Sequence, residues 1–259
     1  MKALFVAWRP PMPAPVGWRP VGKLEQEGEV FRFSYTRGAA KEGFQAFPQM
    51  EDIGRVYLSK SLFPLFANRL LSPSRPEYEN YLQWSGLRSE DHPDPIVLLG
   101  VTEGIRETDA IEVFPCPEPN ADGCYTNKFF VHGVRWLPDV VVQRIAQLQP
   151  GESLKPMLDF QNESDPHAVA IRTESERMQI GYVPRYLARD LQKLAAECGT
   201  KSLELKVERI NQDAPLQNRV LCRMRACWPQ GFRPCDGEEF LPLSQELETP
   251  MLANSSANE

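Results

Sequence analysis

Residues 162–187, NESDPHAVAIRTESERMQIGYVPRYL, carry the pattern that decides the fold of the second half of this chain. A polar turn ends in Asp165-Pro166-His167 and leads into the apolar run AVAIR, and a second polar turn, TESERM, leads into QIGYV. Short apolar runs bounded by such turns are typical of β-strands. We therefore predict two strands here, one on each side of the second turn.

A helix follows these strands. Leu187, Leu191, Leu194 and Cys198 recur at helical spacing, and Gly199 ends the pattern. The neighbouring segments predict a helix from Asp139 to Pro150 and further strands near 154–158, 203–210 and 219–228. This order indicates a small curled sheet with inserted helices, consistent with a barrel of about five or six strands.

The predicted strand at 219–228, RVLCRMRACW, has one basic face. Side chains alternate along a strand, so Arg219, Arg223 and Arg225 point to the side opposite Cys222. Such a stripe is either a solvated outer face or a groove that follows the backbone of a single-stranded nucleic acid. The sequence leaves both interpretations open.

The first part of the chain has a different pattern. FRFSY at 31–35 alternates as a half-buried strand does, and the apolar spacing at 62–70 and 74–86 predicts two helices. Prolines and a glycine then indicate a linker. We therefore predict an α+β protein with a mixed α/β module at 1–115, a linker at 116–128, a barrel domain at 129–233 and a flexible acidic tail at 234–259.

Charge is spread unevenly over the 259 residues, whose formal net charge is −6. Residues 129–233 contain 15 basic and 12 acidic side chains, whereas residues 234–259 contain 6 acidic side chains and no basic one. Only the barrel region is therefore expected to touch a polyanion, through a local patch. No apolar run approaches the ~20 residues of a spanning helix, and the proline-rich N-terminus is a poor secretion signal, so we expect a cytoplasmic protein without membrane contact.

Six cysteines are scattered along the chain without CxxC spacing, and we expect reduced thiols because no export signal is found. A zinc site built from Cys222, Cys227 and Cys235 with a histidine is the alternative, but these cysteines lack the tight spacing of structural zinc sites. The sequence also contains no GxSxG, Walker or HExxH motif. We therefore expect no cofactor, no metal and no enzymatic activity.

Three ordered signatures in the second half resemble the HIRAN domain, a module found at the front of some SWI/SNF-type helicases and in bacteria. They are FVHGVRW at 130–136, NESDPHAVAI at 162–171 and IGYVPRYLA at 180–188, within a run from Phe129 to Trp228. The resemblance implies an oligonucleotide-binding-like barrel that captures single-stranded DNA, especially at a free 3′ end.

The resemblance also implies which residues contact DNA. Arg135 and Trp136 match the basic and aromatic pair after the first strand, and Tyr182 follows the glycine of the GYVPR strand. Asn162 and Asp165 match the polar turn. The arginine would pair with a phosphate, and the two rings would stack on bases. Asp165 would accept a hydrogen bond from the terminal 3′ hydroxyl and would repel a phosphate at that position.

Each of these residues also has a structural interpretation. Asp165 is equally typical of a turn that bonds its own backbone. Trp136 and Tyr182 can be half-buried rim aromatics. Gly181 can serve only close strand packing, and Arg185 is either a solvated charge or a second phosphate contact.

The polar turn departs from the family pattern. Helicase members usually have Asn-Pro-Tyr-Asp there, whereas this chain has Asn162-Glu163-Ser164-Asp165. An aromatic contact is lost and a negative charge is added, which weakens phosphate binding unless Glu163 points away.

Residues 3–113 resemble the small N-terminal subdomain of HipA-type toxin kinases, through GKLEQEGEVFRFSYT at 22–36, SKSLFPLFANRLL at 59–71 and SRPEYENYL at 74–82. The sequence that follows has no Gly-rich phosphate loop and no HRD or DFG segment. The resemblance therefore implies a docking or regulatory unit for a protein partner such as a kinase, helicase or nuclease.

Together these patterns predict a bacterial protein, for example of DNA repair or defence, that binds single-stranded DNA preferentially at a free 3′ end. The first module would be its docking unit. The alternative is an antitoxin-like regulator of a HipA-type kinase that binds no DNA.

Overall fold

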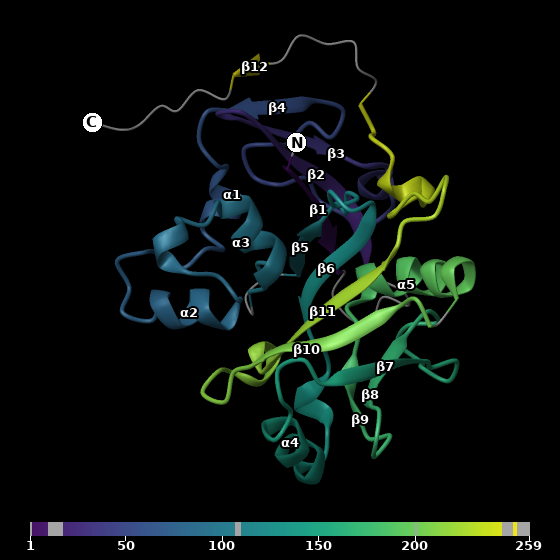
Figure 1. Ribbon diagram of the computed structural model, residues 1–259. Coiled ribbons are helices and arrows are strands. Elements are labelled where there is room, and N and C mark those ends of the chain that lie inside the picture. Colours follow the sequence, from purple (N-terminus) through teal and green to yellow (C-terminus); the bar gives the residue numbers. More distant parts are fainter. Residues whose placement is uncertain (1, 10–17, 107–109, 200, 245–250, 253–259) are drawn as a thin grey trace. The chain divides into compact units, whose positions relative to one another are not determined.

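The computed structural model describes residues 2–9, 18–106, 110–199, 201–244 and 251–252 (Figure 1). The chain divides into two compact units, each with its own six-stranded sheet. The first unit consists of residues 1–72, 94–116 and 235–259, and the second of residues 73–93 and 117–234. The first unit is therefore assembled from three separate segments of sequence.

The first unit has the strand order β12-β4-β3-β2-β1-β5, in which only β12 and β4 run parallel. Aromatic rings fill its core, where Phe33 contacts Tyr35, Phe47 and Phe66. The strands are β1 (Lys2–Trp8), β2 (Arg19–Glu27), β3 (Val30–Tyr35), β4 (Val56–Ser59), β5 (Ile111–Pro115) and β12 (Met251–Leu252); the helices are α1 (Pro64–Ala67) and α3 (Pro95–Thr102), with 3-10 turns η1 (Arg37–Ala40) and η5 (Glu238–Phe240).

Residues 235–244 pack on this first unit, although we predicted a flexible tail from residue 234. The ring of Phe240 lies 4.9 Å from that of Phe5, and the amide of Leu243 donates to the carbonyl of Tyr35. Arg37 pairs with Glu238 at 2.8 Å. The acidic composition of this segment predicted a solvated tail, although Phe240 packs against the first unit. Of residues 245–259, the structure describes only 251–252.

The second unit is an antiparallel sheet with the order β6-β11-β10-β7-β8-β9. Its strands are β6 (Cys124–Phe130), β7 (Ser153–Leu158), β8 (Val169–Thr173), β9 (Gln179–Tyr182), β10 (Glu204–Ile210) and β11 (Val220–Cys227); its helices are α2 (Tyr78–Trp84), α4 (Asp139–Ala146) and α5 (Arg185–Cys198), with 3-10 turns η2 (Ser89–Asp91), η3 (Val134–Trp136) and η4 (Leu216–Asn218).

The two edges of this second sheet meet. The amide of His132, just after β6, donates to the carbonyl of Tyr182 in β9, and the amide of Tyr182 donates back, both at 2.9 Å. Gly181 makes this approach possible, because its φ is +140° and a Cβ there would lie 2.4 Å from Val131 and 2.5 Å from the His132 carbonyl oxygen. The predicted curled sheet with inserted helices is confirmed.

Helix α2 belongs to the second unit, whereas we predicted it within a module at 1–115. Leu82 is buried, and Asn211 donates to the carbonyl of Trp84 at 3.0 Å. A Cβ on Gly86 would lie 3.2 Å from Leu221 of β11. Sequence proximity grouped α2 with the first unit, but its apolar face packs against strands that come more than a hundred residues later.

The predicted linker at 116–128 is also shorter in the structure, because β6 begins at Cys124. The side chain of Asn120 accepts hydrogen bonds from the amides of Asp122 and Cys124 and so forms the turn that starts the strand. A polar side chain, Asn127, occupies a buried position of β6, which hides the period-two pattern.

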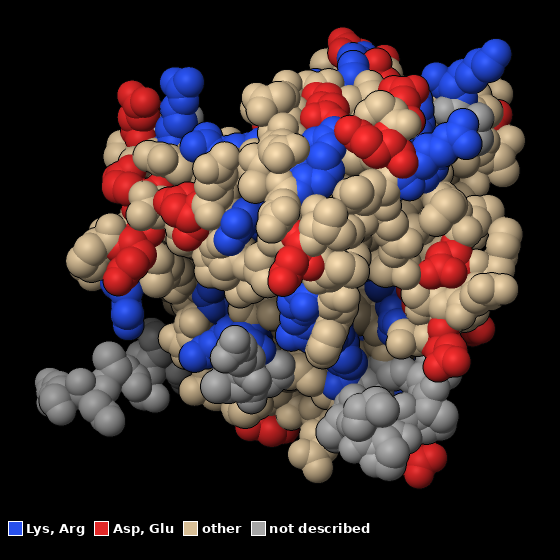
Figure 2. All heavy atoms as spheres, turned by 90° about the horizontal axis from the view of Figure 1, so that it is seen from below, with Lys and Arg blue, Asp and Glu red and all other residues tan. Residues whose placement is uncertain are grey.

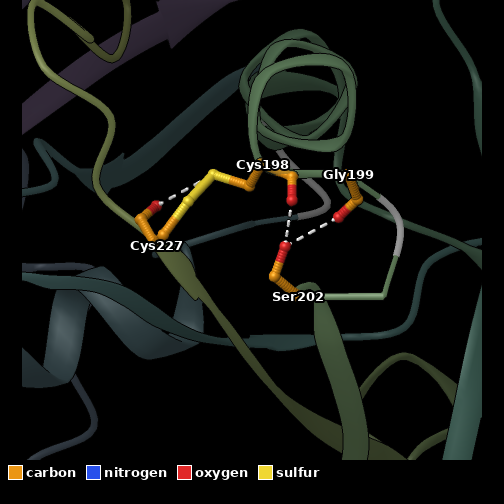
Figure 3. The surroundings of a disulfide bond; sticks show 4 residues. All are labelled: Cys198, Gly199, Ser202 and Cys227. Atoms are coloured by element: carbon orange, nitrogen blue, oxygen red, sulfur yellow. Dashed lines mark hydrogen bonds between the residues drawn. A yellow bond between two sulfur atoms is a disulfide. The ribbon is translucent and has the colours of Figure 1, made fainter.

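One pair of cysteines is oxidised, although we expected reduced thiols. Cys198 at the end of α5 forms a disulfide with Cys227 at the end of β11, across a Cα separation of 6.3 Å (Figure 3). The two cysteines lie 29 residues apart, so their spacing carried no signal. Among the described residues, no helix combines the length and apolar character needed to cross a bilayer, and no group of three or more His, Cys, Asp and Glu side chains could hold a metal ion.

Candidate nucleic-acid interface

The hydroxyl of Tyr182 anchors the centre of the candidate interface. It donates a hydrogen bond to the Oδ2 atom of Asp159 at 2.9 Å, and the side-chain amide of Asn162 donates to the same oxygen at 3.3 Å. These bonds hold the pKa of Asp159 below its usual value, with the Tyr182 bond as the largest cause. The Asp159 carboxylate is therefore charged at neutral pH.

The polar turn after Asp159 is fixed by its own side chains. The Oδ1 atom of Asn162 accepts from the amides of Ser164 at 3.1 Å and Asp165 at 3.0 Å. The Oδ1 atom of Asp165 accepts from the amide of His167 at 2.9 Å. Asp165 therefore has the turn-forming role that the sequence offered as one interpretation.

Asp165 also forms an ion pair. Its Oδ2 atom lies 3.1 Å from the Nε atom of Arg185, the first residue of α5, and only 14% of its side chain is exposed. Arg185 donates in addition to the carbonyl of Ser164. The Arg185 guanidinium is thus paired within the domain, and its two contacts join the polar turn to the first residue of α5.

The loop after β6 carries the basic and aromatic pair. The ring of Trp136 is 76% exposed, and the guanidinium carbon of Arg135 lies 4.7 Å from its centroid. Gly133 begins this turn with φ of +78°, and a Cβ there would lie 3.3 Å from the ring of Tyr182. The turn that carries Trp136 therefore starts against Tyr182.

Neighbouring strands add a row of side chains on one face. Met157 of β7 is the register partner of Ala170 in β8, which is the partner of Tyr182 in β9. Cross-strand partners share a face of the sheet, so Met157, Ala170 and Tyr182 lie on one face, with Ala170 buried between the longer side chains. Lys155 and Arg172, partners one step along the same strands, lie on the same face.

A continuous chain of contacts thus joins the predicted site residues. Tyr182 bonds Asp159, which bonds Asn162, and the Asn162 turn holds the ion pair of Asp165 and Arg185. Arg135 and Trp136 belong to the turn that begins at Gly133, and Gly133 lies against the ring of Tyr182.

Residues 125–225 match the HIRAN domain. The match starts in β6 and ends in β11, so it covers the strands of the second sheet. No curated protein matches this chain. A crystal structure of a protein from Lactobacillus plantarum matches at 18% identity and a TM-score of 0.31, over 40% of this chain and 96% of that one. A HIRAN domain indicates nucleic-acid binding in general.

Two side chains of this HIRAN domain were missed by the sequence analysis. Phe160, directly after the strand β7 and Asp159, is 82% exposed, and Asp159 holds the hydroxyl of Tyr182. The large apolar side chains that are exposed among the described residues of the second unit all fall at 136–140 or 157–160. The signal available was a phenylalanine inside the polar run DFQNESD.

The basic stripe of β11 is a different surface. Arg223 lies 3.4 Å from Glu208, which also pairs with Lys128 at 2.6 Å, and Arg225 lies 3.5 Å from Asp122. These acids largely offset the positive charge, which favours the solvated outer face over a groove for phosphates. On the face drawn in Figure 2, Lys and Arg side chains are likewise interspersed with Asp and Glu side chains.

Proposed function

We propose that the HIRAN domain of this chain binds single-stranded DNA and prefers a free 3′ end. The observation that carries the proposal is the chain of contacts around Tyr182, which joins two rings, two guanidinium groups and two carboxylates from four separate segments. Such a mixture suits a nucleotide, because bases stack on rings and phosphates pair with guanidinium groups.

Trp136 and Arg135 are exposed to solvent. The exposed ring gives a base one free face, since the guanidinium covers the other at 4.7 Å. Arg135 stays close enough to this base to pair with its phosphate. Phe160 adds a second exposed ring beside Asp159 and supplies aromatic surface that the turn lost at Ser164.

The preference for a 3′ hydroxyl rests on the carboxylates. A carboxylate has about four acceptor positions, and Asp165 uses two of them for His167 and Arg185. It therefore keeps the capacity to accept a hydrogen bond from a sugar hydroxyl. Asp159 places a second negative charge in the same network, so a terminal phosphate in this position is repelled.

Fluorescence anisotropy tests this proposal directly. Short oligonucleotides that differ only in a 3′ hydroxyl or a 3′ phosphate are titrated with the full chain at two salt concentrations, because phosphate contacts make affinity salt-dependent. We expect the 3′-phosphorylated strand to bind about tenfold more weakly, which corresponds to loss of one charge-assisted hydrogen bond. Equal affinity for both strands would remove the end preference, and no binding of either would remove the DNA function.

A protein-binding function is the second candidate, and the exposed apolar side chains at 136–140 and 157–160 favour it. In this second function the first unit binds a protein partner such as a kinase, helicase or nuclease. The chain then acts as a regulator of a HipA-type kinase, and its HIRAN domain binds no DNA. Affinity capture from nuclease-treated extract separates the two. Loss of one stoichiometric partner in Phe160→Ala, with unchanged DNA affinity, would favour the protein-binding function; loss of DNA affinity alone would favour the first proposal.

A further inference from the structure

Three cysteines meet at one end of the second sheet. Cys227 ends β11 and forms the disulfide with Cys198 (Figure 3). It is also the register partner of Cys124, the first residue of β6. Direct partners in an antiparallel pair have Cα atoms about 4.5–5.5 Å apart and side chains on the same face. That separation falls within the range of about 4.4–6.8 Å that a disulfide requires. Cys227 therefore has two cysteines within bonding reach.

Cys124 is a free thiol with a cation beside it. Its side chain is partly exposed, and the Nη2 atom of Arg225 lies 3.4 Å from its sulfur. The hydrogen bond with Cys124 is the largest cause of a raised pKa of Arg225. Arg225 also lies 3.5 Å from Asp122 and opposite Glu204 of β10, so it is shared by several negative groups. The guanidinium therefore contacts directly the sulfur that acts as the nucleophile in an exchange reaction.

We propose that Cys124, Cys198 and Cys227 form a thiol–disulfide exchange site in which Cys227 alternates between two partners. The Cys124 thiolate attacks the sulfur of Cys227, a Cys124–Cys227 bond forms, and the Cys198–Cys227 bond breaks. The electron pair leaves on the sulfur of Cys198, which takes a proton from water. One disulfide and one thiol are present before and after the step, so no oxidant or reductant is needed.

The surroundings explain which disulfide is present at rest. Cys198 lies at the C-terminal end of α5, where the helix dipole disfavours a negative charge on its sulfur and so favours keeping Cys198 in the disulfide. Ser202 donates to the carbonyls of Cys198 and Gly199, which marks this end of the helix as a cluster of acceptors (Figure 3). The bond between Cys198 and Cys227 therefore persists until the exchange occurs.

The exchange changes which elements the disulfide connects. In the resting state it ties α5 to β11, whereas after exchange it joins β6 and β11, which already pair along seven register positions. The end of α5 is then released from the sheet.

Disulfide mapping by mass spectrometry tests the proposal on the full chain. Cys198→Ser and Cys124→Ser are equilibrated in the same glutathione redox buffer, alkylated with iodoacetamide and digested without reduction. We expect Cys198→Ser to contain the Cys124–Cys227 disulfide and Cys124→Ser to contain the Cys198–Cys227 disulfide, each in most molecules. If Cys124 and Cys227 remain alkylated in Cys198→Ser while the other variant forms its disulfide, the proposal is wrong. Failure of both variants to form a disulfide would overturn it as well.

A pair of arginine variants tests the role of the cation. Arg225 and Arg223 lie on the same face of β11 with nearly equal exposure, 49% and 48%, but only Arg225 bonds the Cys124 sulfur. We expect Arg225→Ala to slow the reaction of Cys124 with a disulfide reagent by about three- to tenfold, and Arg223→Ala to leave it unchanged. Equal rates in the two variants would exclude activation by Arg225. Circular dichroism verifies that each variant is folded.

Discussion

Trp136 exposes a large ring to water with a guanidinium against it, and it makes little contribution to the core of its unit. We expect Trp136→Ala to raise the dissociation constant for single-stranded DNA by about 5- to 150-fold, because stacking of one base contributes on the order of 1–3 kcal/mol. The free energy of unfolding should stay nearly constant. Val140→Ala is the matched control, since this exposed apolar residue lies on α4 and has no ring, and equal losses of affinity in both variants would contradict the stacking role.

The Tyr182 hydroxyl and the Asp159 carboxylate form a pair that titration can test. The hydrogen bond lowers the pKa of Asp159 in the folded chain, so its stabilising effect is present above the unfolded value of about 3.9 and is lost as pH falls through the folded value. We expect Tyr182→Phe, which keeps the ring, to move the pKa of Asp159 upward toward the ordinary value. Carboxyl chemical shifts followed by NMR measure this change, and an unmoved pKa would show that the hydroxyl does not bond the carboxylate in solution.

The resemblance to the HIRAN domain names Asn162, Asp165 and Tyr182 as candidate site residues, because the polar turn and the strand at 179–182 carry two of the family's signatures. The partners of Asp165 and Tyr182 could not be named, because Arg185 and Asp159 lie 20 and 23 residues away and are brought close only by the strands and α5. The ion pair therefore came from the structure, and contact of Asp165 with DNA stays a prediction.

Among the elements, the junction between β9 and the end of β6 depends on one glycine. We expect Gly181→Ala to destabilise the chain by about 2–4 kcal/mol, because the new methyl group overlaps Val131 and the His132 carbonyl and the backbone has positive φ. Urea unfolding measures the loss. Gly151→Ala is the control: its φ is +88° but a Cβ meets nothing within 4 Å, so strain alone should cost about 1 kcal/mol. A similar loss in both variants would show that the close approach at Gly181 does not matter.

Some helices and strands can be predicted from the sequence pattern, and others cannot. β8, β9 and α5 have apolar residues at strand or helix spacing and polar turns between them, and they lie where the patterns predict. β6 was partly assigned to a linker because Asn127 breaks its alternation. α3 was missed because PIVLLGVT is apolar nearly throughout, so a buried helix of this kind lacks the one-sided pattern that identifies helices.

For the whole molecule, the late segment around η5 is a structural part of the first unit. We expect Phe240→Ala to destabilise that unit by about 1–2 kcal/mol, because this half-buried ring packs against Phe5 and Phe114. Hydrogen exchange should accelerate in β1 and β5 and stay unchanged in β6 to β11. Leu241→Ala is the control, since that neighbouring side chain is exposed, and uniform acceleration over both units would contradict the assignment.

The division of the first unit into three segments is the feature that sequence patterns are least able to reveal, because nothing local marks residues 235–244 as the complement of residues 2–36. This division affects how the chain folds during its synthesis on the ribosome. Phe5 and Phe114 leave the exit tunnel well before Phe240, so the apolar surface that Phe240 covers stays exposed while residues 117–234 are translated. Until residues 235–244 emerge, this exposed apolar surface makes the nascent chain a substrate for chaperones.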